Sequence, residues 1–103
     1  MQAYSHALDA LGDPTRRRVL ELVRDHGPAA VGAIADELPV SRPAVSQHLR
    51  VLQEAGLVTC TREGTRRLYA VDPAGLGELR RWLDGFWDEA LARYRRAAEG
   101  SRR

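Results

Sequence analysis

Residue types suited to hydrogen-bonded recognition gather in one short stretch, between Ser41 and Arg50. On a helical wheel this stretch separates a polar set from an apolar set that includes Val45, Leu49 and Leu52. A planar guanidinium can bond a guanine edge or a phosphate in two places at once, and hydroxyl and amide groups can read other base edges. The outward-facing set predicted for this helix is Arg42, Pro43, Ser46, Gln47 and Arg50.

A helix of this kind fits the major groove of DNA, and its N-terminal residues meet base edges. We therefore expect Arg42, Ser46 and Gln47 to read bases and Arg50 to contact phosphate, against the alternative of an ordinary solvated helix face. His48 lies at the edge of the apolar stripe, so a histidine packed and bonded to backbone competes with a phosphate contact. Enzymatic chemistry is not expected, because Ser46, His48 and Glu54 lie on one helix at spacings that do not converge.

A second cluster of cations surrounds a predicted turn at Glu63-Gly64. The segments 57–61 and 68–71 are rich in β-branched and aromatic residues and predict a β-hairpin across the intervening loop. Glycine supplies the conformational freedom that such a turn needs. The tip is expected to project a positive patch away from the body and to contact DNA phosphates or the minor groove, the alternative being a solvated hairpin. This patch consists of Arg62, Arg66 and Arg67.

Helical spacing and capping signals predict the elements that position these two clusters. A fourth helix, capped by Ser41 and ended by Gly56, is expected about three residues after a third helix, which Pro39 ends. That separation is typical of a helix-turn-helix. The predicted fold is mainly α with a small β-hairpin, a winged helix-turn-helix in the order α-α-α-α-β-β-α within one domain, 1–103. The five predicted helices span 3–11, 14–26, 31–38, 42–55 and 73–97.

Composition limits the class of protein. With 103 residues, 44% of them hydrophobic and 29% charged, the chain is long enough for one core and is not typical of a disordered protein. The net charge is +2, and every one of the 16 cations is arginine. Cys60 is the only cysteine, which excludes an intrachain disulfide and leaves either a small core residue or a redox-active thiol at the root of the hairpin. No secretory or membrane-spanning segment is expected, so a cytoplasmic location is predicted.

The last predicted helix carries an apolar stripe that a single small core has little room to bury. Packing against a second copy of the chain is the favoured interpretation. The aromatic residues Trp82, Phe86, Trp87 and Tyr94, together with Tyr4, could instead line a pocket for a small organic effector. The members of the stripe are Leu76, Leu79, Leu83, Phe86, Trp87, Ala90 and Tyr94.

The order of elements, together with the stretches 10–16, 41–52 and 54–58, resembles the ArsR/SmtB family of bacterial repressors. The resemblance covers nearly the whole chain. It implies a homodimer built on the first and last helices, which adds Tyr4 and Leu8 to the expected dimer interface. It also implies that two recognition helices enter successive major grooves of a near-palindromic operator on double-stranded DNA and repress transcription from a nearby promoter.

The chain departs from the pattern of the metal-sensing members of that family. Those members carry cysteines in the helix before the recognition helix, or histidines and carboxylates along the last helix. Here the segment 31–38 has no thiol, and the last helix has no histidine. Asp84 and Asp88 lie four residues apart on that helix, but two carboxylates without a nitrogen or sulfur ligand make a poor transition-metal site. No metal and no cofactor are expected. The rival class is a winged-helix module that binds proteins, which the salt dependence of DNA binding would distinguish.

Overall fold

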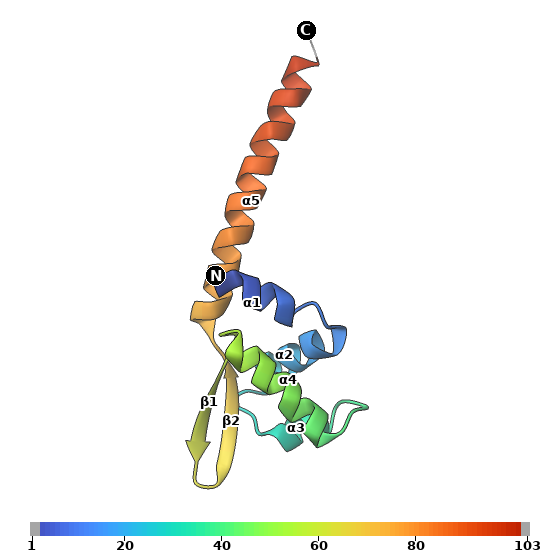
Figure 1. Ribbon diagram of the computed structural model, residues 1–103, viewed down its shortest axis with the longest axis vertical. Helices are drawn as coiled ribbons and strands as arrows, with labels where there is room; N and C mark the ends of the chain where they lie inside the picture. The colour runs from blue at the N-terminus through green and yellow to red at the C-terminus, as the bar shows by residue number, and fades with distance from the viewer. Residues whose placement is uncertain (1–2, 102–103) are drawn as a thin grey trace.

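The computed structural model describes residues 3–101, with side chains from residue 5 onward. Within that part of the chain, five helices and one two-stranded antiparallel hairpin follow one another in the predicted order (Figure 1). The fold class predicted from the sequence is therefore confirmed. The elements are α1 (Ala3–Ala10), α2 (Pro14–His26), α3 (Val31–Ala35), α4 (Arg42–Glu54), β1 (Val58–Glu63), β2 (Arg66–Val71) and α5 (Pro73–Gly100).

The start of α2 follows from the pair Asp13-Pro14. The Asp13 carboxylate accepts hydrogen bonds from the backbone N–H groups of Thr15 at 2.8 Å and Arg16 at 3.1 Å. Pro14 occupies the first turn, where its missing N–H costs no intrahelical bond. The same arrangement recurs at α5, where Asp72 accepts from the N–H of Ala74 at 3.0 Å.

The third helix is shorter than its apolar spacing predicts, so the predicted range of 31–38 was wrong. It ends at Ala35, so six residues, 36–41, separate it from α4 rather than about three. Beyond Ala35 the chain still turns, but the N–H groups of Glu37 and Leu38 bond carbonyls three residues back, at 3.2 and 3.1 Å. These tighter bonds keep Leu38 half-buried without continuing the α-helix. A close contact between Nε2 of His26 and the carboxylate of Glu37 ties this turn to the end of α2.

The hairpin forms as predicted, but its strands are longer than expected. Residues 62, 63, 66 and 67, which were predicted to lie in the connecting loop, belong to the strands. Glu63 pairs with Arg66, which leaves Gly64 and Thr65 as the two turn residues. Gly64 has a φ of 64°, and no non-glycine residue in the described chain has a positive φ. This combination fits the tight turn that requires glycine at its first central position. A short bridge between Ala29 and Tyr69, with N–H to oxygen distances of 2.9 and 2.8 Å, anchors β2 to the segment before α3.

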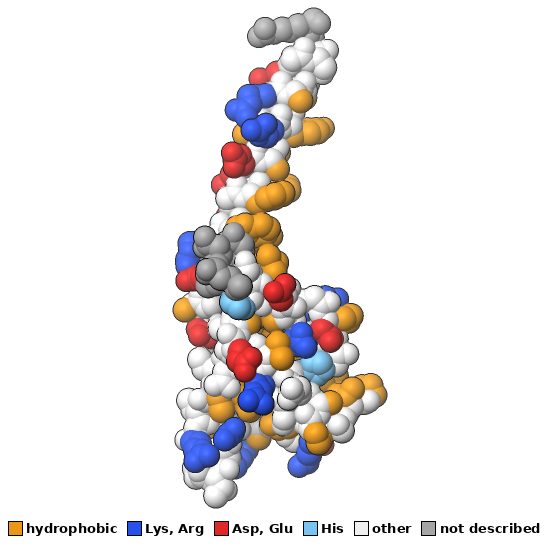
Figure 2. Space-filling view, viewed as in Figure 1, with side chains coloured by type: hydrophobic (Ala, Val, Ile, Leu, Met, Phe, Trp, Pro, Cys, Tyr) orange, Lys and Arg blue, Asp and Glu red, His pale blue; other side chains and the backbone are white. Residues whose placement is uncertain are grey.

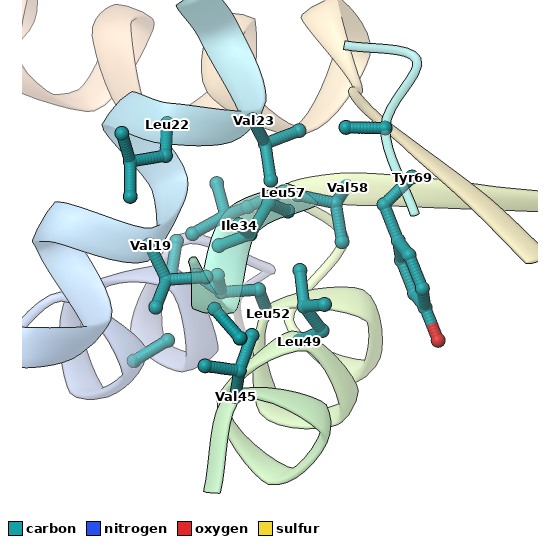
Figure 3. Close-up of a cluster of buried hydrophobic side chains, with 14 of the residues drawn as sticks. Val19, Leu22, Val23, Ile34, Val45, Leu49, Leu52, Leu57, Val58 and Tyr69 are labelled. Carbon is teal, nitrogen blue, oxygen red and sulfur yellow. The ribbon is translucent and has the colours of Figure 1, made fainter. Parts of the chain in front are cut away.

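One hydrophobic cluster holds these elements together (Figure 3). Its largest fully buried side chains come from α2, α3, α4 and the segment that leads into β1, and α1 adds two buried alanines. The Tyr69 ring extends from the edge of the cluster, with its oxygen pointing away from the other labelled side chains. The largest fully buried residues are Leu22, Ile34, Leu49, Leu52, Leu57, Val19, Val23 and Val45.

Helix α5 starts against the body and then runs beyond it (Figure 1). Its first turns pack on α1, and Leu79 is buried there, only 8% exposed. The remainder extends the molecule to 67 Å along its longest axis, against 26 and 23 Å across. Of the helices in the described part of the chain, none is both long enough and apolar enough to cross a bilayer.

The junction between α4 and α5 depends on a close approach of two backbones at Gly75. A Cβ added there would lie 1.8 Å from the carbonyl oxygen of Gly56. Gly75→Ala should therefore lower the free energy of unfolding by at least about 2 kcal/mol, because neither backbone can move away cheaply. Urea unfolding followed by circular dichroism at fixed protein concentration measures this.

Gly85→Ala is the matched control, because it lies on the same helix with nothing within 4 Å of an added Cβ. It should stabilise the protein by about 0.5–1 kcal/mol, the usual gain when alanine replaces glycine in a helix. Equal effects of the two substitutions would contradict the close approach.

Candidate nucleic-acid interface

Helix α4 presents two distinct faces. Ser41 caps its start by accepting a hydrogen bond from the N–H of Ala44 at 3.3 Å, and a proline lies in its first turn. Val45, Leu49 and Leu52 are buried at 0% exposure. The outward set predicted from the sequence is exposed as a whole, and it consists of Arg42, Pro43, Ser46, Gln47 and Arg50.

Arg42 lies at the start of α4, but its side chain folds back onto α3. A Cβ built on Gly32 would lie 3.0 Å from Nη2 and 3.1 Å from Cζ of Arg42. Because Gly32 has no side chain, the Arg42 guanidinium can pack against α3 at this position. Arg42 remains exposed, so its donors face solvent at the N-terminal end of the helix.

A groove separates the outward face of α4 from the hairpin. It has a volume of about 510 Å³. Three of its residues, Val31, Gln53 and Tyr69, were not among the site residues predicted from the sequence. Gln53 follows Arg50 by three positions and Ser46 by seven, so helical periodicity could have found it. The groove is lined by Val31, Ser46, Gln47, Arg50, Gln53, Arg67 and Tyr69.

The three hairpin arginines do not point the same way, contrary to expectation. Arg62 pairs directly with Arg67. Because side chains alternate between the two faces of a strand, this pair lies on the same face of the hairpin as the pair Cys60 and Tyr69. Arg66 pairs with Glu63 and belongs to the opposite face. All three arginines are exposed, but only Arg67 lines the groove. Strand alternation therefore divides the expected patch into two faces.

Tyr69 connects the core to the groove. It is only 6% exposed, yet it lines the groove beside Arg67. Burial raises the pKa of the phenol, and its interaction with the Cys60 thiol raises that pKa further, while the Arg67 guanidinium acts in the opposite direction. These three side chains therefore form one interacting group on one face of the hairpin. Cys60 itself is half-buried and packs against the core.

His48 lies apart from the exposed face of α4. It is half-buried, and its Nδ1 is buried without a hydrogen-bond partner among residues 3–101, so the predicted backbone bond is not made there. His48 lies near enough to influence Asp13, the cap of α2: a backbone hydrogen bond from Arg16 is the main cause that lowers the Asp13 pKa, and a second one from Thr15 and the electrostatic interaction with His48 act in the same direction. The structure thus places His48 in the contact between α2 and α4.

The apolar stripe of α5 divides into a covered part and an exposed part. Leu79 is buried and Leu76 is half-buried against the chain's own core. Contrary to the prediction, these two residues therefore do not belong to a free face. Phe86 is 63% exposed, with its ring centroid 5.7 Å from that of Trp82. Ala90 is also exposed, and the side chain of Tyr4 lies outside the described residues. The large exposed apolar residues are Leu8, Leu83, Phe86, Trp87 and Tyr94.

Helix α5 carries charged and apolar side chains on different sides. In the view of Figure 2, hydrophobic side chains run along one side of α5 and charged side chains lie on the other, and further arginines lie at the hairpin end of the molecule. Arg50 makes an exposed pair with Glu54, with Nε to Oε1 at 3.6 Å, an interaction that solvent weakens. Among the described residues, no group of three or more histidine, cysteine or acidic side chains is arranged to hold a metal ion.

Comparison with known proteins places this geometry in context. A family model described as a helix-turn-helix domain matches residues 11–61. The HTH-type transcriptional regulator Rv2034 of Mycobacterium tuberculosis is 57% identical over 85% of this chain and 81% of its own length. The transcriptional repressor SdpR of Bacillus subtilis is 30% identical over 80% of this chain and 90% of its own length.

A solved structure agrees in fold. The homodimeric winged helix-turn-helix DNA-binding domain of a possible ArsR-family transcriptional regulator from Mycobacterium bovis superimposes with a TM-score of 0.67. It shares 30% sequence identity, over 84% of this chain and 80% of that one.

Proposed function

This chain belongs to the ArsR family of winged helix-turn-helix transcriptional regulators, and we propose that it acts as a homodimeric repressor that occupies a near-palindromic operator. The observation that carries the proposal is the groove whose walls are the polar face of α4 and Arg67 of the hairpin. Two such surfaces, related by a two-fold axis, would bind half-sites one helical turn apart, roughly 34 Å.

Within each copy, the parts of the surface have different roles. Arg42, Ser46 and Gln47, near the start of α4, are the candidates for base contacts, because the N-terminal residues of a recognition helix meet base edges. Arg50 and Arg67 both line the groove, one from α4 and the other from β2, and are the candidates for phosphate contacts. Repression then requires no catalysis, because the bound dimer excludes polymerase from the promoter.

Dimerisation is proposed through α1 and the free length of α5. The exposed fractions of Leu8, Leu83, Trp87 and Tyr94 are 41, 48, 64 and 72%, a large apolar surface for a monomer to leave in water. We assign this stripe to a second copy of the chain rather than to an organic effector, because the residues follow one long helix face rather than enclosing a cavity. The solved Mycobacterium bovis domain is described as homodimeric, which supports the assignment.

Arg42→Ala should weaken binding to the preferred duplex by about 1–3 kcal/mol, the value of a good bidentate base contact. Fluorescence-anisotropy titration against duplexes tiling the upstream region, with a scrambled duplex beside them, measures the loss. Arg18→Ala is the control, because Arg18 is half exposed on α2 and pairs with Glu21 instead. Equal weakening on the scrambled duplex would show that Arg42 contacts phosphate only.

Trp87→Glu should convert the protein from a dimer to a monomer of 11.5 kDa at micromolar concentration, because it places a charge in the proposed apolar interface. Sedimentation equilibrium gives the mass directly. Arg96→Glu, on the opposite side of the same helix, should leave the dimer intact. A wild-type protein that sediments as a monomer would contradict the assignment of the stripe.

Zinc should leave DNA affinity unchanged, because the segment 31–38 has no thiol and α5 has no histidine. The anisotropy titration is repeated with added zinc chloride and again with a chelator, and the two curves should coincide. A shift of tenfold or more in either direction would contradict metal-independent repression.

A further inference from the structure

The groove between α4 and the hairpin brings two cations together from separate elements. Arg50 comes from the third turn of α4, and Arg67 from β2. Apart from these cations, the groove offers the hydroxyl of Ser46, the amides of Gln47 and Gln53, and the phenol of Tyr69. It has no carboxylate among its lining residues. Such a lining suits an anion with several acceptor oxygens.

The side of the hairpin that faces this groove carries an unfavourable pairing. Arg62 lies directly opposite Arg67, and like charges in that position repel each other. Neither guanidinium has an ion pair within the described part of the chain. On the other side of the hairpin, Arg66 lies opposite Glu63. The repulsion between paired arginines therefore occurs only on the face of the hairpin that lines the groove, where a bound phosphate would reduce it.

Tyr69 is fixed more firmly than its neighbour Arg67. Its backbone makes both hydrogen bonds of the bridge to Ala29, and its ring is held in the core cluster. Arg67 lies two positions earlier on the same strand, so both side chains leave the same face of β2. The influence of the Arg67 guanidinium on the pKa of the phenol agrees with this proximity. The long, mobile side chain of Arg67 thus lies beside a rigid acceptor.

We infer that the groove binds one DNA backbone phosphate, and that Tyr69 is a positioning residue that orients Arg67 toward this phosphate. This inference rests on the proposed function and goes beyond it, because Tyr69 acts through Arg67 and need not touch DNA. In this arrangement the phenol oxygen would accept a hydrogen bond from the guanidinium, which would keep the other N–H groups of Arg67 directed at the phosphate. Arg50 neutralises the same phosphate from the opposite wall.

The test uses a labelled duplex of mixed sequence, because a phosphate contact is independent of base sequence. Dissociation constants are measured for each full-length variant from about 50 to 200 mM salt, the range over which such contacts weaken strongly. Arg67→Ala should reduce the slope of log affinity against log salt by about 0.9, the value of one phosphate. Arg66→Ala removes the same charge from the other face of the hairpin and should leave the slope unchanged.

Tyr69→Phe removes only the phenol oxygen and should weaken binding about threefold. In the Arg67→Ala background the same change should have no further effect, because the residue it positions is gone. Arg67→Lys keeps the positive charge but loses the planar guanidinium, so it should weaken affinity while retaining the salt slope. This variant tests the direction of the guanidinium N–H groups without altering the core. Melting temperatures confirm that each variant is folded.

Two results would overturn the inference. One is an equal loss of slope in Arg66→Ala and Arg67→Ala, and the other is an undiminished effect of Tyr69→Phe when Arg67 is absent. Failure of the proposed function gives a different pattern: the variants would differ as expected on the mixed duplex, but no upstream duplex would be preferred. A wild-type protein that binds no duplex at low salt would contradict both.

Discussion

The burial of the inner face of α4 is the interaction on which the rest of the structure depends. Val45, Leu49 and Leu52 are wholly withdrawn from solvent, and burying each such side chain contributes roughly 1.5–3 kcal/mol. Rotation of the helix by a single position, about 100°, would expose them. The direction of every other side chain on α4 follows from this constraint, so Ser46 and its outward neighbours face solvent as a consequence of core packing.

The same core also places the hairpin. Gly56 ends α4 with a φ of 78°, and Leu57 immediately re-enters the cluster at 0% exposure. The Leu57 N–H bonds the carbonyl of Leu52, and the Leu57 carbonyl accepts from Asp72 at the start of α5, each at 2.9 Å. With Tyr69 held to Ala29, the hairpin is fixed at both its root and its middle. The position of the hairpin, and with it the groove beside α4, is therefore determined by contacts within the fold.

Much of this arrangement could be predicted from the sequence because it depends on local signals. Asp-Pro pairs mark the starts of α2 and α5, and period-two and period-3.6 patterns separate the strands from α4. The end of α3 was predicted wrongly because Leu38 continues the apolar spacing, although its N–H bonds only three residues back. Leu79 was assigned to a free face because helical periodicity cannot distinguish packing on α1 from packing on a partner. The membership of Tyr69 in the groove depends on strand pairing across the hairpin, which the strand pattern alone does not specify.

The account places DNA contacts at the hairpin end of the molecule and the partner contacts on α5 (Figure 2). Backbone amide chemical-shift mapping by NMR, before and after addition of the preferred duplex, tests this division most directly. The account predicts the largest changes within 42–50 and 62–69, with 84–100 nearly unchanged. Changes concentrated along 84–100, with α4 and the hairpin silent, would contradict it.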